Sequence, residues 1–193
     1  MKRYILTGAP GAGKTLILRQ LELEGFGVVE EAATDLIALW QARGIAEPWR
    51  EDFFIDAIAE LQSHRQERAA FEPVEIQFHD RSPVCTAALA TYLTRPITGG
   101  LARELDRIQT HSIFEKQVFF IRNLGFIKNT EARRISFEDT LRFERIHEDV
   151  YRNFGFDLVF VEPGSVEERA AAIKKALSLA AVTTSISLVP ESM

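Results

Sequence analysis

The sequence has very little cysteine: Cys85 is the only one in 193 residues. A single cysteine cannot form an internal disulfide, and no Cys/His spacing typical of a zinc site is present. This excludes a small secreted domain that is held together by disulfides. We therefore expect a protein of the reducing cytoplasm.

Long apolar runs and an excess of positive charge are also missing. No run approaches the ~20 apolar residues that span a bilayer, and Lys2-Arg3 leads into a short strand pattern rather than a signal peptide. The 23 Lys and Arg residues face 28 Asp and Glu residues, which gives a net charge of −5. That sign does not suit a protein that coats a phosphate backbone. We expect no membrane partner, and the charge disfavours a nucleic-acid partner.

The composition does provide enough apolar material for a core. Hydrophobic residues make up 46% of the chain and charged residues 26%, which is ordinary for one compact domain. The sequence shows no internal repeat and no low-complexity tract. We expect a single domain over residues 1–182, followed by a flexible tail over 183–193.

A glycine-rich motif near the start carries the chemistry. The segment Gly8-Ala9-Pro10-Gly11-Ala12-Gly13-Lys14-Thr15 matches Gly-x4-Gly-Lys-Thr and lies between two short apolar runs. Such a loop turns backbone N–H groups toward phosphates, with the lysine on the β- and γ-phosphates and the Thr hydroxyl on Mg²⁺. A plain glycine turn would leave the Lys and Thr unexplained. The motif predicts an ATP and Mg²⁺ site made by Gly8, Gly11, Ala12, Gly13, Lys14, Thr15 and Leu16.

Short β-rich runs alternate with longer helical patterns, which predicts an α/β fold with a parallel sheet covered by helices on both faces. The expected strands are 3–7, 26–30, 75–79, 117–122 and 157–161. The expected helices are 14–23, 83–93, 101–113, 138–153 and 165–180. Residues 31–71 read as two further helices, broken near Gly44 and restarted at Pro48. This helical arm, about 32–72, is a candidate wall for a second-substrate pocket.

Carboxylates follow the second and third expected strands, at the edge of the sheet where open α/β folds collect their ligands. Asp80 is the candidate on the metal side, with Thr15; the alternative is a helix N-cap. Glu30 and Glu31 are candidates for a general base, with Asp35 in reserve. The alternative for the two glutamates is a favourable interaction with the positive end of the following helix.

Arginines are candidates for stabilising the charge of a transferred phosphoryl group. Arg133 and Arg134 lie in a charged, weakly apolar segment that we expect to form an exposed lid over about 126–139. Arg122 ends the fourth expected strand. Solvated surface arginines are the alternative for the pair.

These residues together resemble a known group. The resemblance is carried by eight parts of this sequence: Gly8 to Thr15, Val29-Glu30-Glu31-Ala32-Ala33, His79-Asp80-Arg81-Ser82-Pro83, Arg133-Arg134, Phe143-Glu144-Arg145-Ile146-His147, Tyr151, Gly155-Phe156-Asp157 and Ser165-Val166-Glu167-Glu168-Arg169. They resemble the small P-loop ATPases of the AAA-like domain group. That group is similar to the ribosylnicotinamide kinase domain of the bacterial NAD-synthesis regulator and, more distantly, to deoxynucleoside kinases.

The resemblance implies a three-layer P-loop kinase fold with sheet order 2-3-1-4-5, Mg-ATP as a ligand and a lid segment. Glu31 and Asp80 match the acids after strands two and three, and Arg133 or Arg134 matches a lid arginine. One position departs from the pattern: related kinases tend to have an arginine where this chain has Thr34.

Our first hypothesis is a kinase that transfers the γ-phosphate of ATP to a small, hydroxyl-bearing, nucleoside-like metabolite that the sequence does not identify. The rival is a nucleotide-dependent ATPase or switch that acts on a protein partner. A GTPase is disfavoured because the chain has no Asn-Lys-x-Asp motif.

Overall fold

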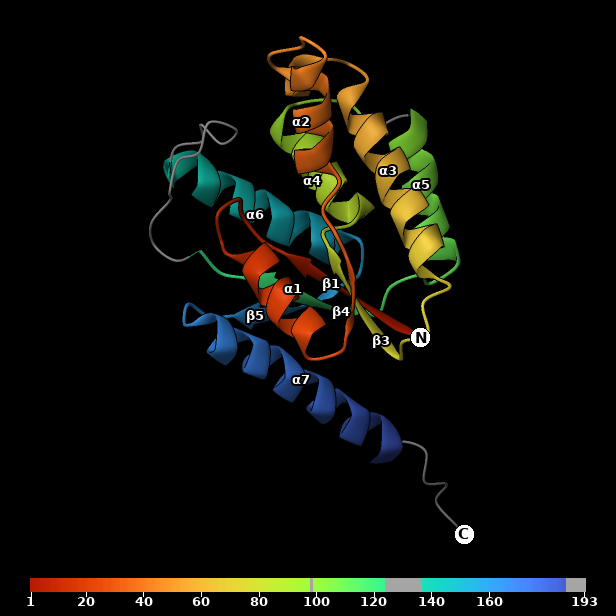
Figure 1. Cartoon of the computed structure of the whole chain (residues 1–193), viewed down its shortest axis with the longest axis vertical. Helices are drawn as coiled ribbons and strands as arrows, with labels where there is room; N and C mark the ends of the chain where they lie inside the picture. Colours follow the sequence, from red (N-terminus) through yellow and green to blue (C-terminus); the bar gives the residue numbers. More distant parts are fainter. Residues whose placement is uncertain (98, 124–136, 187–193) are drawn as a thin grey trace.

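The computed structural model describes residues 1–97, 99–123 and 137–186, and its sheet has five parallel strands in that part of the chain (Figure 1). The sheet order is β2-β3-β1-β4-β5, so the expected order and direction are confirmed. The strands are β1 (Lys2–Thr7), β2 (Gly27–Val29), β3 (Ile76–Asp80), β4 (Gln117–Ile121) and β5 (Asp157–Val161).

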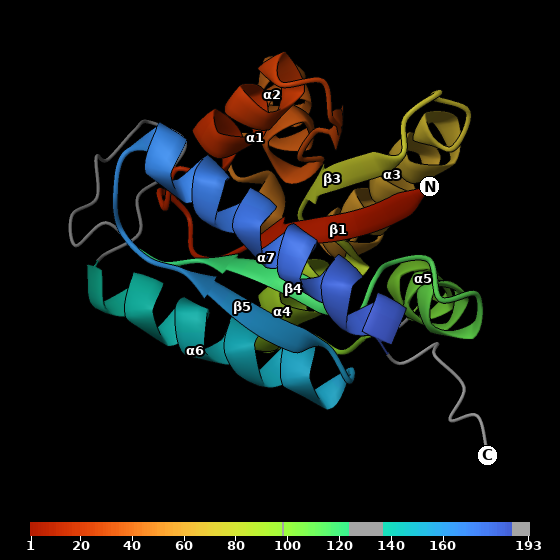
Figure 2. The same ribbon diagram turned by 90° about the horizontal axis from the view of Figure 1, so that it is seen from below.

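Helices cover both faces of the sheet, which gives the expected three layers. Helices α1 (Lys14–Leu23) and α7 (Val166–Ile186) lie on one face, and Figure 2 shows α7 in front of the sheet. On the other face lie α3 (Phe54–Ala69), α4 (Pro83–Tyr92), α5 (Gly99–Thr110) and α6 (Phe137–Asn153). Between β2 and α3 come α2 (Ala33–Ala42) and the short 3-10 helix η1 (Pro48–Arg50).

The two core layers follow from alternation along β1. Tyr4 and Leu6 pack with α1 and α7, whereas Ile5 packs with the helices of the opposite face. Successive side chains of a strand point to opposite faces, so a strand that is covered on both sides must be apolar throughout. The carboxyl ends of the strands then meet at one edge, where Leu6 is paired with Asp80.

Several helix boundaries differ from the sequence-based expectation; α5, for example, spans Gly99–Thr110 rather than 101–113. Pro48 does not restart a long helix; it begins η1, and α3 begins later, at Phe54. Proline suits the first turn of a 3-10 helix as well as an α-helix, because neither needs its missing N–H there. The last helix continues to Ile186 rather than ending at 180; the rest of the expected tail, 187–193, lies outside the described residues.

Local signals at other helix ends agree with the structure. Gly25 and Gly44 follow α1 and α2 with φ angles of 92° and 90°, the left-handed conformation that glycine adopts most easily. Before α7, the Ser165 hydroxyl accepts the Glu168 N–H at 3.2 Å, and the Glu168 carboxylate accepts the Ser165 N–H at 2.8 Å. This is a capping box, and its Ser-x-x-Glu spacing can be seen in the sequence at Ser165 and Glu168. No helix among the described residues has the length and apolar character needed to cross a membrane.

His79 on β3 is buried, so its protonation is expected to destabilise the fold. Its Nε2 lies 2.9 Å from the side-chain oxygen of Gln77, and its ring meets Phe114 edge-on at 4.9 Å. Burial, with a smaller contribution from Arg3, lowers the pKa of His79 to about 3. Below the ordinary histidine pKa of about 6.5 the unfolded chain therefore binds a proton that the folded chain excludes.

We expect the free energy of unfolding to fall as pH drops from 7 to 4.5, with His79 contributing up to about 1.4 kcal/mol per pH unit. Denaturant unfolding at several pH values measures this slope. The variant His79→Gln keeps a side-chain donor, and its free energy of unfolding should depend less steeply on pH, by up to about 1.4 kcal/mol per pH unit. The control His111→Gln, at an exposed position, should have the same slope as the parent. Equal slopes in all three proteins would contradict the prediction.

Candidate functional site

The glycine motif forms the loop between β1 and α1, in the context that the sequence predicts. Gly8, Gly11 and Gly13 have φ angles of 128°, 81° and 83°. A Cβ added at Gly8 would lie 2.3 Å from the carbonyl oxygen of Ile121 on β4, so the loop passes too close to the sheet for any side chain there. The loop conformation therefore depends on glycine at these positions.

Lys14, the first residue of α1, folds back over the loop. Its Nζ donates hydrogen bonds to the carbonyl oxygens of Gly8 at 3.1 Å and Ala9 at 3.0 Å. Burial, together with the nearby Arg81 guanidinium, lowers the pKa of Lys14 to about 8, while Asp80 and Glu31 act in the opposite direction. The ammonium is thus held inside the loop, where it would meet a phosphate.

Thr15 and Asp80 lie together beside the loop. The Thr15 hydroxyl donates to Oδ2 of Asp80 at 3.3 Å. The other carboxylate oxygen, Oδ1, is buried and has no hydrogen-bond partner among the described residues. Burial raises the pKa of Asp80, Glu31 adds to the rise, and Lys14 opposes it. The N-cap position of α4 belongs to Ser82, so the capping alternative for Asp80 is not seen.

This pair fits Mg²⁺. A buried carboxylate oxygen that lacks a partner, next to a threonine hydroxyl, supplies the hard oxygen donors that the ion prefers. No group of three or more His, Cys, Asp or Glu side chains within the described ranges could hold a metal by itself. Mg²⁺ in nucleotide sites commonly takes its other ligands from phosphates and water. When bound, the ion would neutralise phosphate charge.

We expect Asp80→Asn to raise the Mg²⁺ concentration needed for half-maximal turnover about tenfold or more, because the neutral amide is a poorer partner for the ion and its ligands. A metal titration at saturating ATP measures the change. Thermal unfolding without metal serves as the control for folding. Identical Mg²⁺ titrations of variant and parent would leave Asp80 without a role at the metal.

Glu31 lies just after β2, against an arginine from the end of β3. Nε of Arg81 donates to the Glu31 carboxylate at 2.5 Å, and the Thr34 hydroxyl donates to its other oxygen at 2.7 Å. The side chains of Arg81 and Glu31 are 10% and 15% exposed. Arg81 has a φ of 74°, which is uncommon for a residue with a side chain and typical of functional sites.

The other two base candidates have different surroundings. The carboxylate of Glu30 pairs with Arg19, and that of Asp35 pairs with Arg65; both carboxylates are 56% exposed. Arg65, from α3, also donates to the backbone oxygens of Glu30 and Glu31. Arg65 was not among the residues predicted from the sequence; it joins the helical arm to the loop after β2 across 34 residues.

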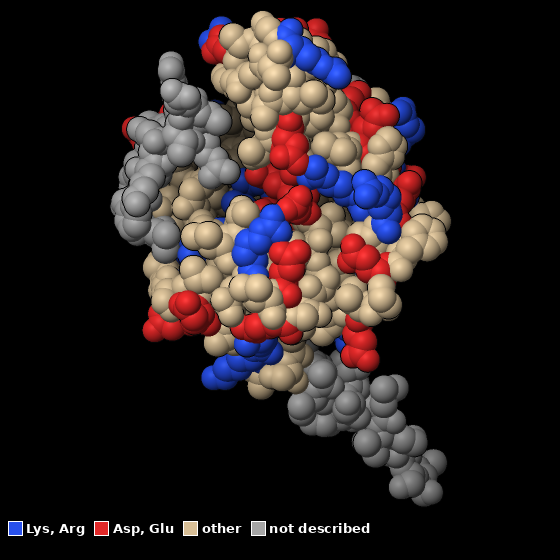
Figure 3. All heavy atoms as spheres, in the orientation of Figure 1, with Lys and Arg blue, Asp and Glu red and all other residues tan. Residues whose placement is uncertain are grey.

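A cavity of about 340 Å³ lies between Thr15, Asp80 and the three acids that follow β2. Figure 3 shows acidic and basic side chains gathered in the middle of this face, above α1. The cavity brings the predicted carboxylates to one place beside the loop. Its lining consists of Thr15, Leu18, Arg19, Val28, Glu30, Glu31, Thr34, Asp35 and Asp80.

Arg169 on α7 supports the loop from behind. Its guanidinium donates to the carbonyl oxygen of Ala12 at 2.6 Å, and a Cβ at Gly13 would lie only 3.0 Å from it. The side chain is 3% exposed, and burial lowers its pKa. Arg169 is the last residue of the segment Ser165 to Arg169, and the sequence predicted no role for it.

Arg122, the other predicted arginine that the structure describes, does not line this cavity. Arg122 donates to Glu148 at 2.5 Å and Glu144 at 3.4 Å, and its guanidinium lies 4.0 Å above the Phe160 ring. These contacts engage it with α6 and β5. Arg133 and Arg134, with residues 126–136 of the expected lid, lie outside the described residues; residues 137–139 of that expected lid instead begin α6.

A family model described as an AAA domain matches residues 3–169, which include the phosphate loop and the carboxylates described above. The chain belongs to this AAA-domain family of P-loop proteins. The expected family is thereby confirmed. No curated protein sequence matches the chain.

Solved structures share the fold of this AAA-domain protein at low identity. The NadR protein in complex with NAD and AMP-PNP is 18% identical, with a TM-score of 0.65 over 100% of this chain and 51% of the NadR chain. Deoxyadenosine kinase from M. mycoides with bound dATP is 15% identical, with a TM-score of 0.60 over 92% and 100%. The same kinase with products dCMP and dCDP is 14% identical, with a TM-score of 0.60 over 91% and 98%. The P-loop kinase fold is thus confirmed.

Proposed function

We propose that this protein binds Mg-ATP and transfers its γ-phosphate to the hydroxyl of a small, nucleoside-like acceptor. The observation that carries the proposal is the pairing of Glu31 with Arg81 at the wall of the cavity that Thr15 and Asp80 also line. A largely buried carboxylate held in one orientation is suited to accept a proton from a bound hydroxyl.

The proposed reaction requires little of the protein beyond positioning and charge stabilisation. The acceptor hydroxyl gives its proton to Glu31 while its oxygen forms a bond to the γ-phosphorus. The bond from that phosphorus to the bridging oxygen breaks, and ADP leaves. Lys14 and the backbone N–H groups of the loop would stabilise the charge on the phosphate oxygens. Arg133 and Arg134 remain predicted contributors from the expected lid.

Two observations favour a nucleoside-like acceptor. The solved structures that share the fold include a deoxyadenosine kinase and the NadR protein. The cavity of about 340 Å³ is also large enough for a small molecule of that kind.

The rival function, an ATPase or switch that acts through a protein partner, is favoured by one residue. At the position where related kinases tend to carry arginine, the Thr34 hydroxyl instead bonds to Glu31. Glu31 would then orient a water molecule rather than a substrate hydroxyl.

Release of ADP from Mg-ATP tests both functions. The purified protein is assayed alone and with a panel of nucleosides, nicotinamide riboside and small alcohols, with Lys14→Ala as the blank. We expect one acceptor to stimulate release and to be recovered as its monophosphate by mass spectrometry. Slow release of ADP that no acceptor changes would support the ATPase or switch. If the parent neither releases ADP nor binds Mg-ATP more than Lys14→Ala does, both the kinase and the ATPase or switch are contradicted.

A further inference from the structure

Cys85 has a polar environment that the proposed reaction does not use. The side chain is buried, 3% exposed, at the third residue of α4. Its Sγ accepts a hydrogen bond from Nη1 of Arg81 at 3.0 Å and lies 2.9 Å from Nε2 of His147 on α6. A buried cysteine that only fills space would be surrounded by apolar groups. This one is placed between an arginine and a histidine.

The protonation of His147 follows from its second contact. Nδ1 lies 3.0 Å from the carbonyl oxygen of Phe143. A carbonyl oxygen can only accept, so Nδ1 carries a proton. Nε2 then either accepts the S–H of Cys85 or, when it is protonated, donates to the thiolate. The pair holds the same proton in both cases, and Arg81 donates to the sulfur in both.

The surroundings favour the thiolate form. Burial opposes it, but the Arg81 guanidinium and then His147 lower the pKa of Cys85 to about 6. The first turn of α4 adds its positive end. The other titratable groups that act on this thiol are Lys14, from the phosphate loop, and Tyr151, from α6. A thiolate accepts a stronger, charge-assisted hydrogen bond from an arginine than a thiol does.

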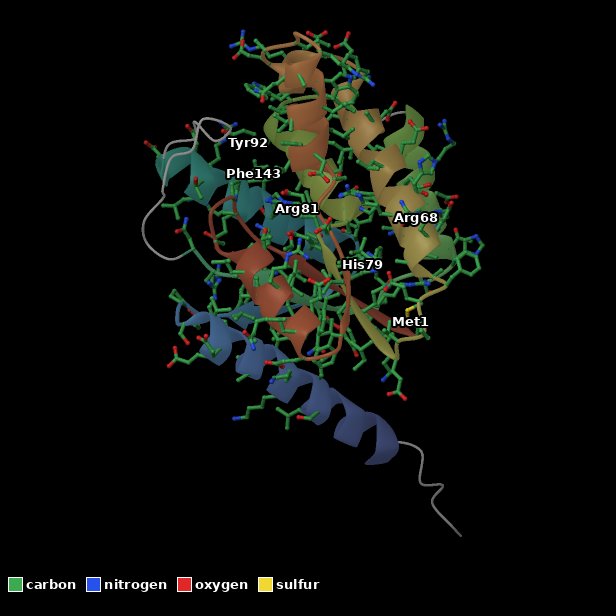
Figure 4. All side chains as sticks on the ribbon, in the orientation of Figure 1. Met1, Arg68, His79, Arg81, Tyr92 and Phe143 are labelled. Carbon is green, nitrogen blue, oxygen red and sulfur yellow. The ribbon has the colours of Figure 1, made fainter. Side chains whose placement is uncertain are left out.

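Arg81 is thus held at two points of its guanidinium, by Glu31 on one side and Cys85 on the other. Figure 4 shows Arg81 near the middle of the molecule, between His79 of β3 and Phe143 of α6. Its backbone has the left-handed φ of 74°, a conformation that persists only where surrounding contacts fix it. Two contacts define the plane of a guanidinium, whereas one leaves it free to rotate.

Helix α6 supplies His147 on a face that meets the start of α4. One turn later, the Tyr151 hydroxyl lies 2.9 Å from the hydroxyl of Ser82. Each pair is a buried polar contact between α6 and the β3–α4 junction. The two contacts differ in one respect that a test can use: Arg81 donates a hydrogen bond to Cys85, whereas the Ser82 and Tyr151 hydroxyls bond to each other.

We propose that Cys85 and His147 are positioning residues, which hold the guanidinium of Arg81 in the orientation that fixes Glu31 for phosphoryl transfer. The proposal rests on the proposed function for its consequence in turnover. A chain of contacts then joins α6 to the base: His147 contacts Cys85, Cys85 accepts from Arg81, and Arg81 donates to Glu31. If His147 is displaced, Cys85 no longer holds Arg81, and Arg81 no longer orients Glu31.

Kinetics of the full chain test the consequence. Cys85→Ala and His147→Gln are compared with Tyr151→Phe, which removes the other polar contact of the same helix. We expect kcat to fall about tenfold to a hundredfold for the first two, as for other small misplacements of a reacting group, with KM for ATP within about twofold. Cys85→Ser should recover part of the loss, and Tyr151→Phe should lower only the melting temperature. An unchanged kcat in Cys85→Ala would overturn the proposal.

A second measurement does not need an acceptor. Because Cys85 is the only cysteine, the ultraviolet absorbance of its thiolate can be titrated directly, with Cys85→Ser as the baseline. We expect thiolate near neutral pH in the parent, and a titration displaced upward by about one pH unit or more in His147→Gln and Arg81→Gln. If the parent shows no turnover above Lys14→Ala, the proposed function fails, and this titration alone decides the positioning. Curves that coincide in the parent and both variants would overturn it.

Discussion

Turnover of Mg-ATP by Lys14→Ala is expected to be about a thousandfold below that of the parent, because one preorganised donor at a transferring phosphoryl group has an effect of that order. In the parent, the Lys14 ammonium is buried and bonded to two loop carbonyls. It can exchange these neutral partners for phosphate oxygens without leaving the loop. The alanine variant loses the charge but none of the glycines that shape the backbone.

ADP release under saturating Mg-ATP measures the effect of Lys14→Ala. The matched control is Lys174→Ala, which removes a partly exposed lysine that pairs with Glu24 far from the loop along the chain; it should keep the parent rate. Circular dichroism and thermal unfolding confirm that both variants fold. Parent-like turnover by Lys14→Ala would contradict the assignment of the loop as the phosphate site.

Replacement of Glu31 by glutamine is expected to lower kcat about a hundredfold to ten-thousandfold, the usual range for a lost general base. Glutamine has nearly the same shape, and its amide oxygen can still accept from Arg81 or Thr34. It cannot take up a proton. KM for ATP should change little, because the glutamate is proposed to act on the acceptor and not on the nucleotide.

The neighbouring carboxylates provide matched controls for Glu31. Glu30→Gln and Asp35→Asn neutralise acids of the same cavity that are 56% exposed and paired with Arg19 and Arg65. Salt bridges at that exposure contribute little, so both variants should stay within about threefold of the parent kcat. If Glu30→Gln or Asp35→Asn loses as much as Glu31→Gln, the base has been assigned to the wrong residue.

The parts of the fold that could be predicted are those with local signals. The loop motif, the alternation of strands and helices, the two glycines after α1 and α2 and the capping box of α7 each depend on residues that are neighbours in the sequence. The sheet order came with the family resemblance. A local signal was wrong where it is compatible with two kinds of helix. Pro48 was expected to begin an α-helix, but it begins a 3-10 helix, whose first turn suits proline equally well.

The contacts between distant side chains could not be predicted. Arg81 meets Glu31 across 50 residues and His147 meets Cys85 across 62, and no pattern in the sequence encodes such a distance. The sequence offered Glu30 and Glu31 as candidates for the base, with Asp35 in reserve. In the fold they differ in exposure and in the arginine that each one meets. Two of those arginines are distant in the sequence: Arg65 comes from α3, and Arg81 follows β3. The choice among the three stays a prediction for the variants above.

The hydrogen bond from Arg169 to the carbonyl of Ala12 joins residues 157 positions apart. Contacts of such long sequence separation form late in folding, because a large loop of chain must close first. During synthesis the glycine loop leaves the ribosome early, but its support follows only with α7. We therefore expect chains that end before residue 169 to form a nearly complete sheet. Their glycine loop should bind the triphosphate of a nucleotide with lower affinity than the loop of the full chain. Nucleotide capture would then report that the chain has been made through to its last helix.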